Sequence, residues 1–142
     1  MLLVTSAQHG PRLPSNVRLA RLPELDLDLI LPTRRHGLRG VLEVAARQEG
    51  IVLAPKFEVD VLSTIVRLVE GTRFATILPR IVVQRAVNEG TLAVCPILSP
   101  RIVRHVVRVS HRRRPLSAAA HALIDLVADE IRRVLKAGES GR

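Results

Sequence analysis

The sequence predicts an α/β fold, and two observations support this class. Short apolar runs alternate with amphipathic stretches of helical periodicity between Leu29 and Ile97. The amphipathic stretches end close to Gly50, Gly71 and Gly90, and glycine commonly stops a helix. Strands and helices that alternate with short loops favour a parallel sheet with helices on both faces, because parallel neighbours need crossover connections.

The first strand–helix unit begins with an apolar strand at Leu29–Leu31, which ends at Pro32. A helix is predicted from Leu38 to Gln48, since apolar residues recur on one face and Gly50 follows. The same reasoning predicts the later elements: strands at Ile51–Val59, Phe74–Leu78 and Leu92–Ile97, and helices at Val61–Val69 and Ile81–Val87. Asp60 stands just before the second helix and is predicted to be its N-cap.

The flanking segments have a different pattern. Leu2–Val4 is predicted as a strand, and residues 5–25 as a long connector without clear periodicity. Ile102–Ser110 alternates apolar and polar residues, which predicts a half-buried strand. Ser117 is the expected N-cap of a long helix with an apolar stripe, and the tail from Ala137 onward is expected to fray.

Composition narrows the function classes. Hydrophobic residues make up 47% of the 142 residues and charged residues 25%, as in soluble globular domains, and no apolar run is long enough to span a bilayer. The N-terminus has no recognisable secretory signal, so we expect a cytoplasmic protein. A formal net charge of +9 makes nucleic acid a candidate partner, although aromatic residues for base stacking reach only 1%.

Catalytic and metal motifs are missing from the sequence. It has no nucleophile elbow, P-loop, dinucleotide fingerprint or Cys-rich metal site, and its five histidines show no ligand spacing. Cys95, the single cysteine, lies in an apolar segment and is interpreted as a buried structural thiol. We therefore predict a binding protein without a cofactor, and not an enzyme.

The turn after the first strand is the best candidate site. Thr33, Arg34 and His36 stand between Pro32 and the start of the helix, where backbone N–H groups are free and the helix dipole is positive. Such a turn can hold a small anion such as a carboxylate. The alternative is structural: Thr33 can cap the turn, and Arg34 and His36 can be solvated loop residues.

Four motifs carry a family resemblance. They are LILPTRRHGLR at residues 29–39, ATILP at 75–79, GTLAVCPI at 90–97, and RPLS at 114–117 before an Ala-rich helix. Together they resemble the effector-binding domain of LysR-type transcriptional regulators, and the first motif looks most like the branch that contains the nitrogen assimilation control regulator. The resemblance implies a fold like the type II periplasmic binding proteins, with one complete Rossmann-like lobe and part of a second.

The resemblance also implies an organisation. Residues 1–28 would be a partial first lobe and crossover connector, residues 29–98 the complete second lobe, and residues 99–142 a return to the first lobe with a C-terminal helix. The family's helix-turn-helix has no counterpart here, so we expect a truncated regulator that reaches DNA only through a domain absent from this chain. A homo-oligomer is expected, because uncovered sheet edges and apolar faces associate.

The implied function is the sensing of a small-molecule effector, an anion or carboxylate, in the cleft between the lobes. The candidate contacts are Thr33, Arg34, His36, Ile77, Leu78 and Pro79. Thr33 falls where the family places a hydroxyl that contacts the effector, whereas the last three residues have core and turn roles as their alternative. Two rival functions are a basic, non-specific nucleic-acid binder and a solute-binding module of the same fold without a regulatory role.

Overall fold

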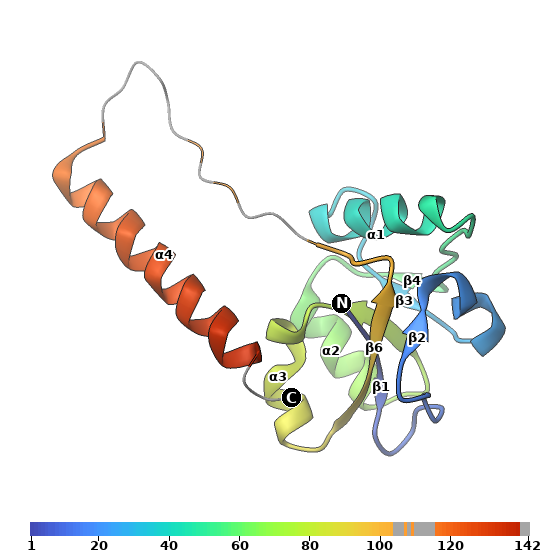
Figure 1. Ribbon diagram of the computed structural model, residues 1–142. Coiled ribbons are helices and arrows are strands. Elements are labelled where there is room, and N and C mark those ends of the chain that lie inside the picture. Colours follow the sequence, from blue (N-terminus) through green and yellow to red (C-terminus); the bar gives the residue numbers. More distant parts are fainter. Residues whose placement is uncertain (104–106, 108, 110–115, 140–142) are drawn as a thin grey trace. The chain divides into compact units, whose positions relative to one another are not determined.

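The computed structural model describes residues 1–103, 107, 109 and 116–139 (Figure 1). The chain divides into two compact units, Met1–Arg104 and His105–Arg142, and each is described by itself. The strands are β1 (Leu2–Ser6), β2 (Val17–Arg18), β3 (Ile30–Leu31), β4 (Phe57–Glu58), β5 (Ala75–Leu78) and β6 (Leu92–Ser99). The helices are the 3-10 helix η1 (Leu19–Leu25) and the α-helices α1 (Gly37–Gln48), α2 (Leu62–Glu70), α3 (Arg80–Asn88) and α4 (Ala118–Glu139).

The first unit is built on a mixed sheet. Four strands have the order β2-β6-β1-β5, and a parallel bridge from Leu29 to Ala75 joins them to the parallel pair β3-β4. β1 runs antiparallel to both β5 and β6, and β2 runs parallel to β6. The α/β class is thus confirmed. The strands from Leu29 onward, β3 to β6, all run in one direction, as predicted. β1, which is predicted outside that set, is the antiparallel strand of the sheet.

The core lies around β1 and β5. Every residue of both strands is buried, and Leu3, Ile77 and Leu78 have no exposed surface. The buried residues of the helices, such as Leu42 of α1 and Ile65 of α2, belong to the same apolar cluster. The apolar residues of the strands and helices thus form one core, and β1 lies at the centre of it.

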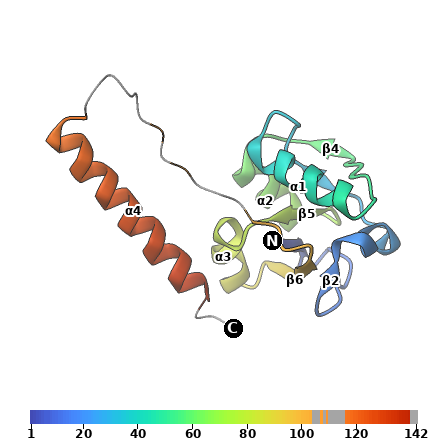
Figure 2. The ribbon, with the colours of Figure 1, turned by 45° about the horizontal axis from the view of Figure 1, so that its top comes forward.

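Helix α1 lies on the opposite face of the sheet from α2 and α3, and the order in which the chain connects the strands explains this placement. The chain passes outward from β3 to β4 through α1, then turns back to β5 through α2 and onward to β6 through α3. Right-handed crossovers then place α1 on one face and the other two helices on the opposite face. In agreement, α2 and α3 contact each other, whereas α1 contacts η1 (Figures 1 and 2).

The three predicted helices are confirmed within one or two residues of their expected ends. Helix α1 ends as expected: Glu49 is its C-cap, and Gly50 follows in the left-handed region with φ 70°. The predicted strand at Ile51–Val59 is reduced to β4. Pro55 has no N–H for a ladder, and the Leu53 carbonyl accepts a hydrogen bond from Arg39 instead of from a strand.

The predicted organisation of the N-terminal residues differs from the structure. β1 lies in the middle of the sheet of the first unit, so it is not placed in a separate first lobe. The predicted connector at residues 5–25 contains β2 and η1, which both contact β6. The sequence lacks periodicity there because β2 has two residues and η1 is a 3-10 helix of seven residues that contains Pro23.

Helix α4 forms the described part of the second unit. Ser117 caps it as predicted, since the Ala120 N–H donates to Ser117 Oγ at 3.2 Å. The helix continues to Glu139, beyond the point where fraying was expected. Residues 101–103, 107 and 109 have no strand assignment, and the rest of the predicted strand at 102–110 lies outside the described residues.

Candidate functional site

The candidate site lies where the parallel strands of the first unit end. β3 and β5 are neighbours, yet the helices that follow them lie on opposite faces of the sheet. Such a reversal point opens a crevice beyond the carboxyl ends of the strands, and ligands of α/β sheets bind there. Thr33 follows β3, Asp60 follows β4, and Pro79 follows β5. The fold thus brings segments far apart in sequence to one edge.

Thr33 and Asp60 hold the ends of β3 and β4 together. The Thr33 backbone N–H donates to Asp60 Oδ1 at 3.0 Å. The Thr33 hydroxyl, its backbone N–H, His36 and Arg35 hold the pKa of the Asp60 carboxyl below its ordinary value. Asp60 therefore serves the turn after β3, and the prediction that it caps α2 is wrong, because Val61 is the N-cap of that helix.

The hydroxyl of Thr33 makes no hydrogen bond of normal geometry among the described residues, and its Oγ1 atom is buried. Asp60 lies close enough for this hydroxyl to favour the ionised carboxyl, so Asp60 is the acceptor that a ligand would have to replace. Buried polar atoms are nearly always paired, so an unpaired hydroxyl is costly for the protein alone. A ligand atom at this position would complete its hydrogen bonding.

His36 is the N-cap of α1. The Leu38 backbone N–H donates to His36 Nδ1 at 3.1 Å, so Nδ1 acts as an acceptor and a ring proton belongs on Nε2. The cap removes one of the free N–H groups that the sequence suggested for an anion. It leaves Nε2–H as the donor that His36 can offer to a ligand.

Several backbone donors remain at the same edge. No side chain caps α2 or α3, whose N-caps are Val61 and Pro79. The first N–H groups of such helices lack intrahelical partners and carry partial positive charge. These N–H groups can donate to an anion, beside the carboxylate of Asp60 at the same edge.

The remaining predicted site residues have different surroundings. Arg34 is exposed in the turn, where it can move toward a ligand. The side chains of Ile77 and Leu78 are fully buried in the core. Pro79 is partly buried and is the N-cap residue of α3. At the end of β5 the crevice is therefore bordered by the backbone of the turn, and not by the side chains of Ile77 and Leu78.

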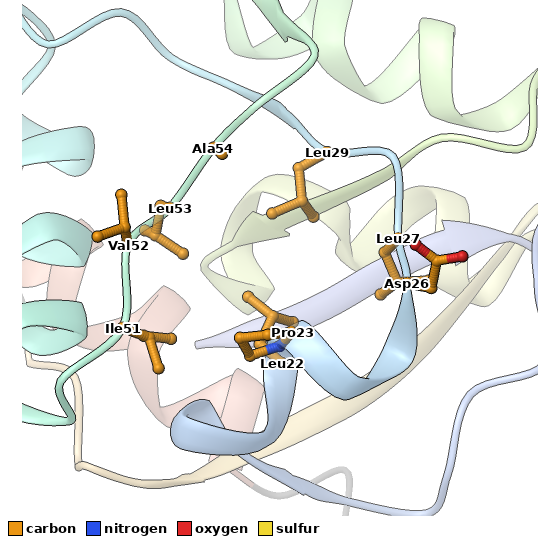
Figure 3. A pocket seen from close by; sticks show the side chains of 9 residues that line it. All are labelled: Leu22, Pro23, Asp26, Leu27, Leu29, Ile51, Val52, Leu53 and Ala54. Carbon is orange, nitrogen blue, oxygen red and sulfur yellow. The ribbon is translucent and has the colours of Figure 1, made fainter.

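The two described pockets do not coincide with this edge. One, of about 190 Å³, is lined mainly by apolar residues that precede β3 and β4, at the other end of these strands (Figure 3). Its lining residues are Leu22, Pro23, Asp26, Leu27, Leu29, Ile51, Val52, Leu53 and Ala54. The other is lined by Arg34, Arg39, Gly40, Glu43, Arg47, Ile51 and Val52. Of the predicted site residues only Arg34 lines either of these pockets.

Sequence reasoning missed Arg39. Its side chain is 1% exposed, and its guanidinium contacts Glu43, Glu58 and the carbonyl oxygens of Pro32 and Leu53. The available signal was its spacing: Arg39 precedes Leu42 and Ala46 by three and seven residues, which puts a charge on the buried face of the helix. Glu43 at the i+4 position supplied the matching partner.

Replacement of His36 by alanine tests the cap of α1. Loss of an N-cap acceptor is expected to lower the free energy of unfolding by about 1 kcal/mol. His36→Asn is expected to recover most of this loss, since Asn is a strong N-cap. Urea denaturation of the three proteins makes the comparison, and equal stability of His36→Ala and wild type would remove the capping role.

Two other kinds of feature are not found among the described residues. They contain no group of three or more His, Cys, Asp or Glu side chains that could hold a metal ion. No described helix combines the length and apolarity needed to cross a membrane.

A search of curated proteins found no match to the sequence. The family model for the LysR substrate binding domain, however, matches residues 1–132. The chain therefore belongs to the LysR substrate-binding domain family, whose fold is like that of the type II periplasmic binding proteins.

Proposed function

We propose that this chain senses a small anionic effector, with a carboxylate as the preferred group, for a LysR-type transcriptional regulator. The observation that carries the proposal is the buried, unpaired hydroxyl of Thr33 at an edge where α1, α2 and α3 all begin. Membership of a family of effector-binding regulatory domains supports it. Regulatory domains of this kind bind ligands and do not transform them.

Each residue of the site has a distinct part in the proposal. Thr33 donates its hydroxyl proton to the anion, and Arg34 swings in from the exposed turn to add a charge-assisted hydrogen bond. His36 offers Nε2–H while Nδ1 keeps its bond to the helix. The N–H groups at the start of α3, which follow Pro79, contact the other side of the ligand.

The remainder of the regulator is part of the same proposal. Residues 99–142 return to a first lobe, which supplies the opposite wall of the cleft, and the protein acts in the cytoplasm as a homo-oligomer. Effector binding shifts the lobe and subunit arrangement by its different affinity for the two states. DNA is reached through a helix-turn-helix domain. The likeness to the nitrogen assimilation control branch rests on residues 29–39 alone and stays a prediction.

Thr33→Val tests the site, because valine keeps the shape of threonine and removes its hydroxyl. Binding of the best ligand from a panel of small carboxylates is expected to weaken by about 0.5–3 kcal/mol, the range for a lost hydrogen bond. The free energy of unfolding is expected to stay level or rise, since an unpaired buried hydroxyl is removed. Isothermal titration calorimetry and urea denaturation measure the two quantities.

Thr91→Val is the matched control, because Thr91 is exposed and directly precedes β6, at the end of the sheet opposite to this turn. It is expected to leave carboxylate binding unchanged. Equal affinity of wild type and Thr33→Val would assign Thr33 to the turn alone. Absence of binding in the wild type across the panel would contradict a carboxylate site on this lobe.

A further inference from the structure

Arg39 is the most deeply buried charged residue among those that the structure describes. Its Nε and Nη2 lie 2.7 Å from Glu43 Oε1, within the same helix. Its Nη1 donates to the Pro32 carbonyl at 3.1 Å and to Glu58 Oε1 at 3.0 Å. Burial of a charge is expensive unless it is paired and hydrogen-bonded, and here every guanidinium nitrogen has an acceptor.

The contacts of Arg39 join the two strand ends that carry the site. Pro32 directly precedes Thr33, and Glu58 stands two residues before Asp60. The Nη1 atom of Arg39 bonds both segments, so one nitrogen links the end of β3 to the end of β4. The Thr33–Asp60 hydrogen bond lies just beyond this link.

The strand pairing at this place is short. β3 and β4 are two residues long each, with Ile30 opposite Phe57 and Leu31 opposite Glu58. Beyond these pairs, the Val59 N–H donates to the Leu31 carbonyl at 3.0 Å, and the next contact between the two chains is made by side chains. A planar guanidinium with fixed donor directions can define the distance between two chains, whereas an ammonium group cannot hold the same set of acceptors.

We propose that Arg39 is a positioning residue that fixes the ends of β3 and β4 and thereby holds Thr33 against Asp60. Its importance for effector affinity rests on the function proposed above, but the positioning itself is a property of the unliganded protein. Asp60 then accepts the hydrogen bond of the Thr33 N–H, and the Thr33 hydroxyl is the group that can donate to a ligand.

Arg39→Lys, with Arg47→Lys as the control, tests the proposal without any ligand. Both arginines belong to α1, but Arg47 is exposed. The readout is the Thr33 amide proton in NMR spectra recorded across the acidic pH range, since this proton reports the charge of Asp60. In the wild type, the midpoint of this pH titration should lie below the ordinary pKa of an Asp carboxyl, about 3.9.

The expected result is a midpoint raised by about half a pH unit or more in Arg39→Lys, because a displaced Thr33 donates less well to the carboxylate. Exchange of the Thr33 amide with solvent should also become faster. Arg47→Lys should match the wild type in both respects. Among the groups facing Asp60, Thr33, Arg35 and His36 are unchanged in both variants.

Glu58→Ala provides the second variant, should Arg39→Lys fail to fold. It cuts the link from Arg39 to β4 and keeps the Arg39–Glu43 pair. Removal of a negative charge would by itself lower the pKa of Asp60, so a raised midpoint here points to lost positioning. An unchanged or lowered midpoint in the folded variants overturns the proposal, whether or not the protein binds any carboxylate.

In the ligand-binding arm, Arg39→Lys is expected to weaken the best carboxylate of the panel tenfold or more relative to Arg47→Lys. A raised midpoint with unchanged affinity would keep the positioning and remove its link to the effector site. An unchanged midpoint with weaker binding would overturn the positioning and give Arg39 another role.

Discussion

Leu3→Ala is expected to lower the free energy of unfolding by about 2–5 kcal/mol, the range for large-to-small substitutions in a core. Leu3 has no exposed surface and lies opposite Ile77 on one side and Cys95 on the other. Alanine at this position leaves a cavity on the face of the sheet that the Leu3 side chain covers, and closely packed neighbours cannot close it fully. Chemical denaturation of the full chain, followed by far-UV circular dichroism, measures the loss.

Leu98→Ala is the control for this experiment. Leu98 lies on β6 but is 59% exposed, so its truncation is expected to cost less than about 0.5 kcal/mol. A similarly small cost for Leu3→Ala would mean that β1 is not central to the sheet. It would favour the organisation that assigns the first residues to another lobe.

Arg39→Met is expected to cost about 3–5 kcal/mol, as found when one partner of a buried ion pair is removed. Methionine fills much of the space but leaves Glu43 and the carbonyl oxygens of Pro32 and Leu53 without their donor. The Glu58 side chain is 42% exposed and can turn to water, which places the loss toward the lower end of the range. Urea denaturation measures it.

The combination of Arg39→Met with Glu43→Gln and Glu58→Gln separates charge from packing. It is expected to be more stable than Arg39→Met alone, because no unpaired carboxylate remains near the apolar side chain. If the single and combined variants were equally unstable, the loss would come from packing and not from uncompensated charge. Arg47→Met, at an exposed position on α1, should change the stability by less than about 0.5 kcal/mol.

The helices of the first unit could be predicted from the sequence because local signals agree there. Apolar residues recur at helical spacing in α1, and Gly50 supplies the left-handed conformation that stops it. The N-cap role of Ser117 is equally local, since it depends on a hydroxyl three residues before the N–H that it accepts from. Such patterns need no information about distant segments.

The candidate site was predictable in part for the same reason. A strand, a polar turn and a helix in succession place Thr33, Arg34 and His36 near a helix N-terminus. The cap that His36 provides to α1 is also local, since Nδ1 accepts from a residue two positions on. That Asp60 reaches across to the Thr33 N–H depends on how β3 and β4 meet. The same applies to Ile77 and Leu78, whose strand is central enough for their side chains to be fully buried.

The sequence by itself determined the α/β class, the order of the helices and strands after Leu29, the turn that carries Thr33, and the family. Only the tertiary structure decided that β1 runs antiparallel through the middle of the sheet, and that Arg39 joins Pro32 to Glu58. The physical reason is the range of the interactions. Periodicity and capping act over a few residues, whereas strand direction and the pairing of a buried charge depend on residues that only the fold brings together.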